Sequence, residues 1–346
     1  MSERIAFVFP GQGSQAVGMG ADVYRASPAA HRVFAIADET AGFPLSQLCF
    51  EGPEEQLRET INTQPAIVAT SLALLAAVQE AAGAPAVNDG EPSLTGPLRP
   101  AYVAGHSVGE YAAVAAAGAL DIANTLRLVR ERGRLMHQEG QACESGMAAV
   151  LGMDASALEA ICAEATEQAL AERGAGTGTH PGAGRVVVAN DNAPGQIVIS
   201  GARHALDLAM SMARERGAKR VVPLTVSGAF HSPVMAPASR GLADAVDAAS
   251  LRNARVPLVA NITAQPITLA GDMRSELAQQ IAAPVQWTRS VEYLAAQGVT
   301  TFVEFGAGQV LAGLIKRIAK GATILSVGSA ADVAPAAGQL RERLGD

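Results

Sequence analysis

The feature that most restricts the fold is a regular alternation of short apolar runs with longer stretches of helical periodicity. The short runs are Ile5–Phe9, Ala101–Ala104, Val256–Ala260 and Thr301–Phe305. The helical stretches between them include Ala66–Ala82, Glu110–Ala117 and Ile122–Glu139. This alternation is typical of a parallel sheet covered by helices, so the sequence predicts the α/β class.

A second rhythm occupies residues 145–223 and interrupts the first. The order there is strand, helix, strand, strand, helix, strand, over Met147–Leu151, Ala155–Glu172, Arg185–Ala189, Gln196–Ser200, Ala205–Arg216 and Arg220–Pro223. This βαββαβ order is that of a ferredoxin-like unit. We therefore expect a small subdomain at 145–223, inserted into a larger domain made of residues 1–144 and 224–346.

Three segments rich in Gly and Pro are predicted to lie outside regular structure. Pro85–Pro100 is expected to be a surface loop, and Gly174–Gly184 a mobile loop within the small subdomain. Pro335–Gly338 is expected to be a turn before a last short helix.

Composition and charge exclude several classes of partner. The 346 residues carry 26 basic and 33 acidic side chains, a net charge of −7, and no basic stripe, which argues against nucleic-acid binding. The apolar stretch from Pro65 to Ala86 is interrupted by Gln79 and Glu80, so a buried helix is expected there rather than a membrane span.

The cysteines and the N-terminus indicate the compartment. Cys49, Cys143 and Cys162 form no CxxC pair, so neither a disulfide framework nor a zinc site is expected. The opening residues, MSERIAFVFPGQGSQ, lack the features of a secretory signal. A cytoplasmic protein with no metal site is therefore expected.

The most informative motif is Gly105-His106-Ser107-Val108-Gly109, which lies between a predicted strand and a predicted helix. A G-x-S-x-G sequence in that position forms a sharp turn that exposes the serine hydroxyl above the sheet. The N–H group of Val108, at the start of the helix, would face a reacting carbonyl as an oxyanion donor. Ser107 is therefore the candidate nucleophile.

A serine nucleophile needs a base, and elimination favours one of the six histidines. Four lie in helical stretches or in the small subdomain, namely His31, His137, His180 and His204, while His106 lies within the turn with its side chain expected to point away from the serine. His231 lies in a loop of small residues where the chain re-enters the large domain. It is therefore the candidate general base.

An arginine occupies an unexpected position on the helix Asp121–Glu139. At about 100° per residue, the core face of this helix spans roughly 320° to 40°, and Arg132 lies near 280°, beside that face rather than on the solvated one. A buried guanidinium must find an anion. Either a protein carboxylate or the carboxylate of a substrate would satisfy it, and both readings stay open at this point.

Two other loops rich in glycine follow predicted strands. Gly11-Gln12-Gly13 lacks the spacing of a dinucleotide-binding or P-loop motif, but its position would let the N–H group of Gln12 act as a second oxyanion donor. Gly306-Ala307-Gly308 is expected to be a tight turn.

Taken together, five motifs resemble the malonyl-CoA:acyl carrier protein transacylase family of fatty-acid and polyketide synthesis. They are Gly11-Gln12-Gly13-Ser14-Gln15, Gly105-His106-Ser107-Val108-Gly109-Glu110-Tyr111, Arg132-Gly133, Gly228-Ala229-Phe230-His231-Ser232 and Pro284-Val285-Gln286-Trp287, and they occur in the order found in the family. The resemblance implies an α/β-hydrolase-like large domain with an inserted ferredoxin-like small subdomain.

The resemblance also implies a reaction and its partners. Malonyl would pass from malonyl-CoA to Ser107 and then to the phosphopantetheine thiol of acyl carrier protein, with coenzyme A thioester as substrate and no bound cofactor. Arg132 would hold the malonyl carboxylate, and Gln280 would orient His231 through its backbone carbonyl. Phe230 would exclude an α-methyl branch and would line the substrate pocket with Met136 and His106. A monomer is expected.

Other functions remain possible from the residues alone. A stand-alone acyltransferase of a polyketide pathway would carry the same motifs. A serine esterase or thioesterase would share the turn at Ser107, but it would have an acidic triad member and no buried arginine. A non-catalytic module that binds acyl carrier protein is the third alternative.

Overall fold

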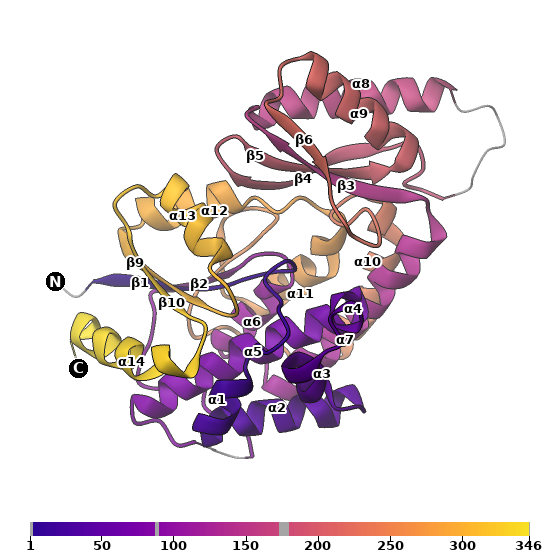
Figure 1. Ribbon diagram of the computed structural model, residues 1–346. Helices are drawn as coiled ribbons and strands as arrows, with labels where there is room; N and C mark the ends of the chain where they lie inside the picture. The colour runs from indigo at the N-terminus through magenta and orange to yellow at the C-terminus, as the bar shows by residue number, and fades with distance from the viewer. Residues whose placement is uncertain (1–2, 87–89, 173–179, 346) are drawn as a thin grey trace.

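The computed structural model describes residues 3–86, 90–172 and 180–345. Over these residues the chain forms two sheets, a larger one of six strands and a smaller one of four. In Figure 1 the smaller sheet and its two helices lie above the larger unit, and both termini emerge at the side of the larger sheet. The α/β class predicted from the sequence is confirmed.

The larger sheet is mostly parallel, with strand order β10-β9-β1-β2-β7-β8. Only β8 runs antiparallel to its neighbour. Its strands are β1 (Arg4–Phe9), β2 (Tyr102–Gly105), β7 (Leu258–Val259), β8 (Pro266–Ile267), β9 (Val299–Phe305) and β10 (Thr323–Val327). The strand predicted at Val256–Ala260 is therefore only two residues long.

Alternate side chains of β1 enter two different cores, which makes this sheet the middle of three layers. Phe7 and Phe9 point to the side of the long helices, whereas Ala6 and Val8 point to the side of the two C-terminal helices. The first side is covered by α2 (Pro28–Ala41), α5 (Thr60–Ala81), α6 (Gly109–Ala116), α7 (Ile122–Ala142) and α14 (Ala330–Leu344). The other side is covered by α12 (Trp287–Ala296) and α13 (Val310–Ile318).

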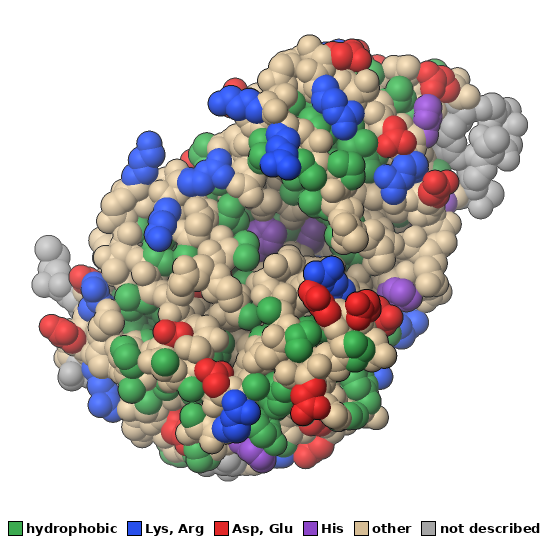
Figure 2. Space-filling view, in the orientation of Figure 1, with side chains coloured by type: hydrophobic (Ala, Val, Ile, Leu, Met, Phe, Trp, Pro, Cys, Tyr) green, Lys and Arg blue, Asp and Glu red, His purple; other side chains and the backbone are tan. Residues whose placement is uncertain are grey.

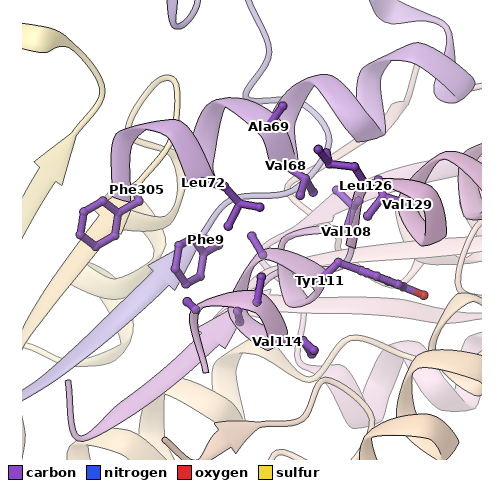
Figure 3. Close-up of a cluster of buried hydrophobic side chains, with 14 of the residues drawn as sticks. Phe9, Val68, Ala69, Leu72, Val108, Tyr111, Val114, Leu126, Val129 and Phe305 are labelled. Carbon is purple, nitrogen blue, oxygen red and sulfur yellow. The ribbon is translucent and has the colours of Figure 1, made fainter. Parts of the chain in front are cut away.

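Figure 3 shows the centre of the first core. Leu72 of α5 points at Phe9 of β1, and Val108 and Tyr111 approach from the turn and helix that follow β2. The Phe9 ring stacks on that of Phe305, with 5.9 Å between centroids. The turn that carries Ser107 is thus anchored in this core through Val108 and Tyr111. The remaining helices surround this core: α1 (Ala21–Ala26), α3 (Leu45–Glu51), α4 (Glu54–Arg58), η1 (Pro233–Met235), α10 (Ala236–Ala248), α11 (Ala270–Gln279) and η2 (Gln280–Ala282).

Helix α5 is the buried helix predicted from the apolar stretch. It is long and apolar enough to cross a membrane, but 89% of its most apolar window is buried inside the protein. It begins at Thr60, six residues before the predicted start at Ala66, with Pro65 inside it. Proline lacks only one N–H donor, and the burial of nearly every α5 side chain offsets that loss.

The predicted turn at Pro335–Gly338 is wrong, because these residues lie inside α14. The helix begins with a reciprocal cap: the Ser329 side chain accepts the backbone N–H of Asp332, and the Asp332 side chain accepts the backbone N–H of Ser329. Its buried face, which includes Leu340, then packs on the core. Capping and packing therefore keep α14 helical across Pro335.

The smaller sheet has the predicted order of strands and helices and is antiparallel throughout, with strand order β4-β5-β3-β6. Its elements are β3 (Ser145–Leu151), α8 (Ala155–Glu172), β4 (Val186–Ala193), β5 (Gln196–Ala202), α9 (Arg203–Glu215) and β6 (Arg220–Pro223). Strand β4 is longer than predicted and reaches the larger unit, where the N–H of Asp191 donates to the carbonyl of Val285 at 3.0 Å. This extension brings its last residues to the cleft.

The structure describes the two predicted loops only in part. Residues 174–179 of the predicted mobile loop and 87–89 of the predicted surface loop lie outside the described residues. The rest of the predicted surface loop is anchored to the protein. Leu94 and Leu98 are buried, and the side chain of Gln79 donates to the Leu98 carbonyl at 2.8 Å. The carboxylate of Glu91 accepts the N–H of Ile122 at the start of α7.

We expect Leu72→Ala to destabilise the protein by about 2–5 kcal/mol, because Leu72 is fully buried and its truncation leaves a cavity between α5 and β1. Urea unfolding of both variants would measure the change. Leu170→Ala is the matched control, since Leu170 on α8 is 42% exposed, and its effect should stay within about 0.5 kcal/mol. An equal loss in both variants would contradict the central role of this core.

Candidate active site

Ser107 lies on a sharp turn between β2 and α6, as the sequence predicts. Its φ angle is 53°, in the left-handed region that few non-glycine residues adopt. The flanking glycines are required, because a Cβ on Gly105 would lie 2.0 Å from the carbonyl oxygen of Gly109. A Cβ on Gly109 would lie 2.1 Å from the Phe9 carbonyl oxygen. The turn therefore depends on close backbone approach at both glycines.

His231 is in direct contact with Ser107, although 124 residues separate them. The Nε2 atom of His231 lies 2.7 Å from the Ser107 Oγ. On the other side of the ring, Nδ1 faces the backbone carbonyls of Gln280 at 2.9 Å and Ala283 at 3.1 Å. Two acceptors at Nδ1 require the proton there, which leaves Nε2 free to accept the serine hydroxyl.

The pKa of His231 is strongly lowered, to about 3, so the imidazole is neutral at physiological pH. The largest cause is burial, since only 3% of the residue is exposed, and the second is the nearby positive charge of Arg132. The residue is therefore held in the form that can accept a proton.

Arg132 is buried, with 1% of its surface exposed, as its position on α7 predicts. Its Nη2 donates to the Ser107 Oγ at 3.1 Å and to the Gln280 side-chain oxygen at 2.8 Å, and its Nη1 donates to the Gln64 side-chain oxygen at 2.7 Å. The Tyr111 ring lies 5.7 Å from the guanidinium carbon. Within the described part of the chain this guanidinium forms no direct ion pair, so the protein-carboxylate alternative is not found.

The other predicted site residues meet around one cavity of about 190 Å³ next to Ser107. It is lined by Gln12, Val108, His106, Met136 and Phe230. Across residues 3–86, 90–172 and 180–345, the N–H groups of Gln12 and Val108 donate to no protein acceptor, and both residues line the cavity. Gln280 is fully buried and does not line the cavity, but its side-chain oxygen contacts Arg132, which does.

The cavity opens between the two units. Figure 2 shows a hollow between the smaller and larger sheets, with histidine side chains visible on its floor. A second cavity of about 680 Å³ adjoins the first and shares Gln12, Leu224 and Val226 with it. Only the first of the two is lined by Ser107 itself.

The four histidines set aside by elimination make other contacts. His31 stacks on Tyr24, and the remaining three lie beside polar partners, namely His137 with Gln141, His180 with Glu139 and His204 with Glu172. His106 lines the cavity, but its Nε2 faces the Asn192 side-chain oxygen at 2.7 Å rather than Ser107. Burial lowers its pKa, so it too is neutral.

Sequence reasoning missed several polar residues that hold the site. Asn261 and Gln64 carried no signal of their own, because isolated amide side chains are common everywhere. Glu110 stands inside the motif around Ser107 but received no role. Asn190 and Asn192 reach the cavity only because β4 extends beyond its predicted end. Among the described residues, no group of three or more His, Cys, Asp or Glu side chains is arranged to hold a metal ion.

Comparison with known proteins finds similarity over nearly the whole chain. Residues 6–341 match the family model described as acyl transferase domain. The chain is 43% identical over 315 residues to the malonyl CoA-acyl carrier protein transacylase of Bacillus subtilis (strain 168), covering 91% of this chain and 90% of that protein.

Solved structures give the same result. The malonyl CoA-acyl carrier protein transacylase of Coxiella burnetii matches with a TM-score of 0.86 at 35% identity, covering 98% of each chain. A complex of a type II PKS acyl-carrier protein with its malonyl-transacylase matches with a TM-score of 0.85 at 34% identity, covering 97% of this chain and 99% of that one.

The lowered pKa of His231 predicts that Ser107 stays reactive in mild acid. Labelling of Ser107 by a fluorophosphonate should slow less than twofold between pH 7.5 and pH 5.0, whereas a base with an ordinary pKa near 6.5 would slow it about thirtyfold. His231→Ala should label slowly at both pH values.

The lowered pKa of His231 also predicts that the folded state loses stability as the pH falls from about 6.5 towards 3. In that pH range the imidazole of His231 binds a proton in the unfolded chain but not in the folded one.

Proposed function

This chain belongs to the acyl transferase domain family, and on that premise we propose that it transfers a malonyl group from malonyl-CoA to the phosphopantetheine thiol of an acyl carrier protein. One observation carries the proposal. At the edge of one cavity, the Ser107 hydroxyl lies 2.7 Å from the neutral imidazole of His231 and 3.1 Å from the buried guanidinium of Arg132. Within the described part of the chain, no carboxylate contacts this guanidinium directly. Such a site suits an acyl group that carries its own carboxylate.

In the first half-reaction His231 Nε2 takes the proton from Ser107 as the hydroxyl oxygen attacks the thioester carbonyl. The negative charge that develops on the carbonyl oxygen is met by the N–H groups of Gln12 and Val108. The C–S bond then breaks, and the sulfur of coenzyme A leaves with the proton returned by His231. The product is a malonyl ester on Ser107.

In the second half-reaction the thiol of the carrier protein attacks that ester. His231 takes the thiol proton and returns it to the Ser107 oxygen as the C–O bond breaks. The adjoining cavity of about 680 Å³ gives room for the phosphopantetheine arm of either thioester. Burial of the acyl group limits attack by water, so transfer prevails over hydrolysis.

Arg132 and Phe230 would select the acyl group. An acetyl group would leave the guanidinium without an anion in a site with little water, whereas the malonyl carboxylate pairs with it. Phe230, which is 5% exposed and lines the cavity, would leave no room for an α-methyl branch. The carbonyl of Gln280 would keep the His231 ring in its reactive orientation.

The surroundings of His231 favour transfer over the esterase alternative. A hydrolase triad would place a carboxylate at Nδ1, and backbone carbonyls of Gln280 and Ala283 stand there instead. A binding module without activity would have no use for a serine hydroxyl in contact with a neutral imidazole.

Fatty-acid synthesis is the pathway we propose, in keeping with the family that the five motifs resemble and with the 43% identity to the malonyl CoA-acyl carrier protein transacylase of Bacillus subtilis. A polyketide pathway is the second candidate, supported by the 34% identity with the malonyl-transacylase of the type II PKS complex. Transfer rates to a fatty-acid carrier and to a polyketide carrier, compared at equal concentration, would separate the two.

We further propose that the larger unit is α/β-hydrolase-like and that residues 145–223 form a ferredoxin-like subdomain inserted into it. The βαββαβ order and the antiparallel sheet support the second assignment. Coenzyme A would enter only as a thioester, and protein side chains would do the chemistry without a resident cofactor. A cytoplasmic monomer remains our expectation.

Incubation with malonyl-CoA should add one malonyl group to the protein, detected by intact mass, and Ser107→Ala should abolish the adduct. Acetyl-CoA and methylmalonyl-CoA should acylate the wild type far more slowly. An adduct that survives Ser107→Ala, or no adduct on the wild type, would disprove the proposed reaction.

Arg132→Ala should slow malonylation about a hundredfold or more, because the substrate carboxylate would lose its only buried cationic partner in the described chain. Acetylation should change much less, so the ratio of the two rates should fall. Arg134→Ala is the matched control, since Arg134 lies on the exposed face of the same helix and pairs with Glu131. Equal losses with both donors would exclude a selective role for Arg132.

A further inference from the structure

Two buried amide side chains hold the backbone of Ser107 from both sides. The Asn261 side-chain oxygen accepts the N–H of Ser107 at 2.8 Å, and the Gln280 side-chain nitrogen donates to the carbonyl of Ser107 at 2.8 Å. Asn261 also donates to the Gly105 carbonyl at 2.7 Å. The strained φ angle of Ser107 is therefore fixed by contacts to its backbone rather than to its hydroxyl.

One carboxylate connects these two amides. Glu110, in the first turn of α6, is fully buried. Its Oε1 accepts the backbone N–H of Asn261 at 2.8 Å and the side-chain nitrogen of Asn261 at 3.0 Å. Its Oε2 accepts the side-chain nitrogen of Gln280 at 2.5 Å. Both oxygens of Glu110 thus serve as acceptors.

This arrangement fixes the direction of the Gln280 amide. Because the nitrogen of Gln280 must face Glu110, its oxygen must face the other way, where it accepts Arg132 Nη2 at 2.8 Å. Glu110 and Arg132 therefore interact through one amide group. The orientation of the guanidinium beside Ser107 depends on which way that amide points.

A second carboxyl lies close to Glu110. Burial raises the pKa of Glu110 and the nearby Glu276 raises it further, while burial raises the pKa of Glu276 to about 7. Glu110 therefore acts on its two amide partners through the geometry of its hydrogen bonds.

We propose that Glu110 is a positioning residue with two arms: through Asn261 it holds the Ser107 turn, and through Gln280 it orients Arg132 toward the acyl carboxylate. The second arm rests on the function proposed above. The first arm does not, because it concerns only the reactivity of the serine. Glu110 touches neither substrate nor the reacting atoms.

The test is Glu110→Gln, which keeps the shape of the side chain but adds an N–H₂ group where only acceptors fit. That group must oppose a donor of Asn261 or of Gln280. We expect fluorophosphonate labelling of Ser107 to slow about tenfold, and the ratio of malonyl to acetyl acylation rates, normalised to titrated active sites, to fall about fivefold or more.

Glu304→Gln is the matched control. Glu304 is equally buried, but its carboxylate accepts the N–H groups of Leu311 and Ala312 at the start of α13 rather than the amides of Asn261 and Gln280. Glu304→Gln should lower stability without changing the labelling rate. It should also leave unchanged the ratio of malonyl to acetyl acylation rates, here called the donor ratio. A variant that only loosens the fold would behave like this control.

Asn261→Ala separates the two arms. Asn261 contacts the Ser107 turn but not Arg132, so this variant should slow labelling and leave the donor ratio within twofold of the wild type. Should Glu110→Gln fail to fold, Glu110→Asp retains the carboxyl group but withdraws it from Gln280 by one methylene group, and the donor ratio should again fall.

Three outcomes would overturn the proposal. The folded Glu110 variant could label at the wild-type rate and keep the wild-type donor ratio, or Glu304→Gln could show the same changes as Glu110→Gln. The donor ratio of Asn261→Ala could also fall as far as that of the Glu110 variant. If the wild type forms no malonyl adduct, the proposed function fails instead. The labelling experiment still tests the first arm in that case.

Discussion

A positive charge kept out of water beside a serine hydroxyl is the constraint on which the rest of this site depends. Arg132 is 1% exposed and is surrounded by neutral acceptors rather than by a carboxylate in direct contact. Burial of a charge in this way is costly unless an anion is near. The protein surrounds the guanidinium with hydrogen-bond acceptors, and an acyl carboxylate would provide the anion.

The same charge shapes the base. His231 is neutral because it is buried and because Arg132 lies close to it, and its proton is held on the side of Gln280 and Ala283 by their carbonyls. Its other nitrogen is thereby available to Ser107. Ser107, His231 and Arg132 thus lie in contact within one site, and the charge of Arg132 lowers the pKa of His231.

The fold was predictable where local pattern determines it and less so where packing decides. The β1 strand, the turn at Ser107 and the βαββαβ order follow from periodicity and glycine spacing. The helix boundaries at Pro65 and Pro335 were wrong for one reason. Proline lowers local helix propensity, but burial of α5 and the cap of α14 outweigh that cost, and neither effect is visible in a short window of sequence.

Sequence by itself determined which chemical groups are present and which of them stand out: a serine between two close-packed glycines, a histidine in a loop of small residues, and an arginine beside the apolar face of its helix. Only the tertiary structure decided how they meet. Asn261 and Gln280 reach the Ser107 backbone from segments more than 150 residues away, and Asn192 reaches His106 only because β4 extends into the cleft. Hydrogen bonds of a few ångströms between such distant segments are set by the packing of the whole chain, which no local pattern records.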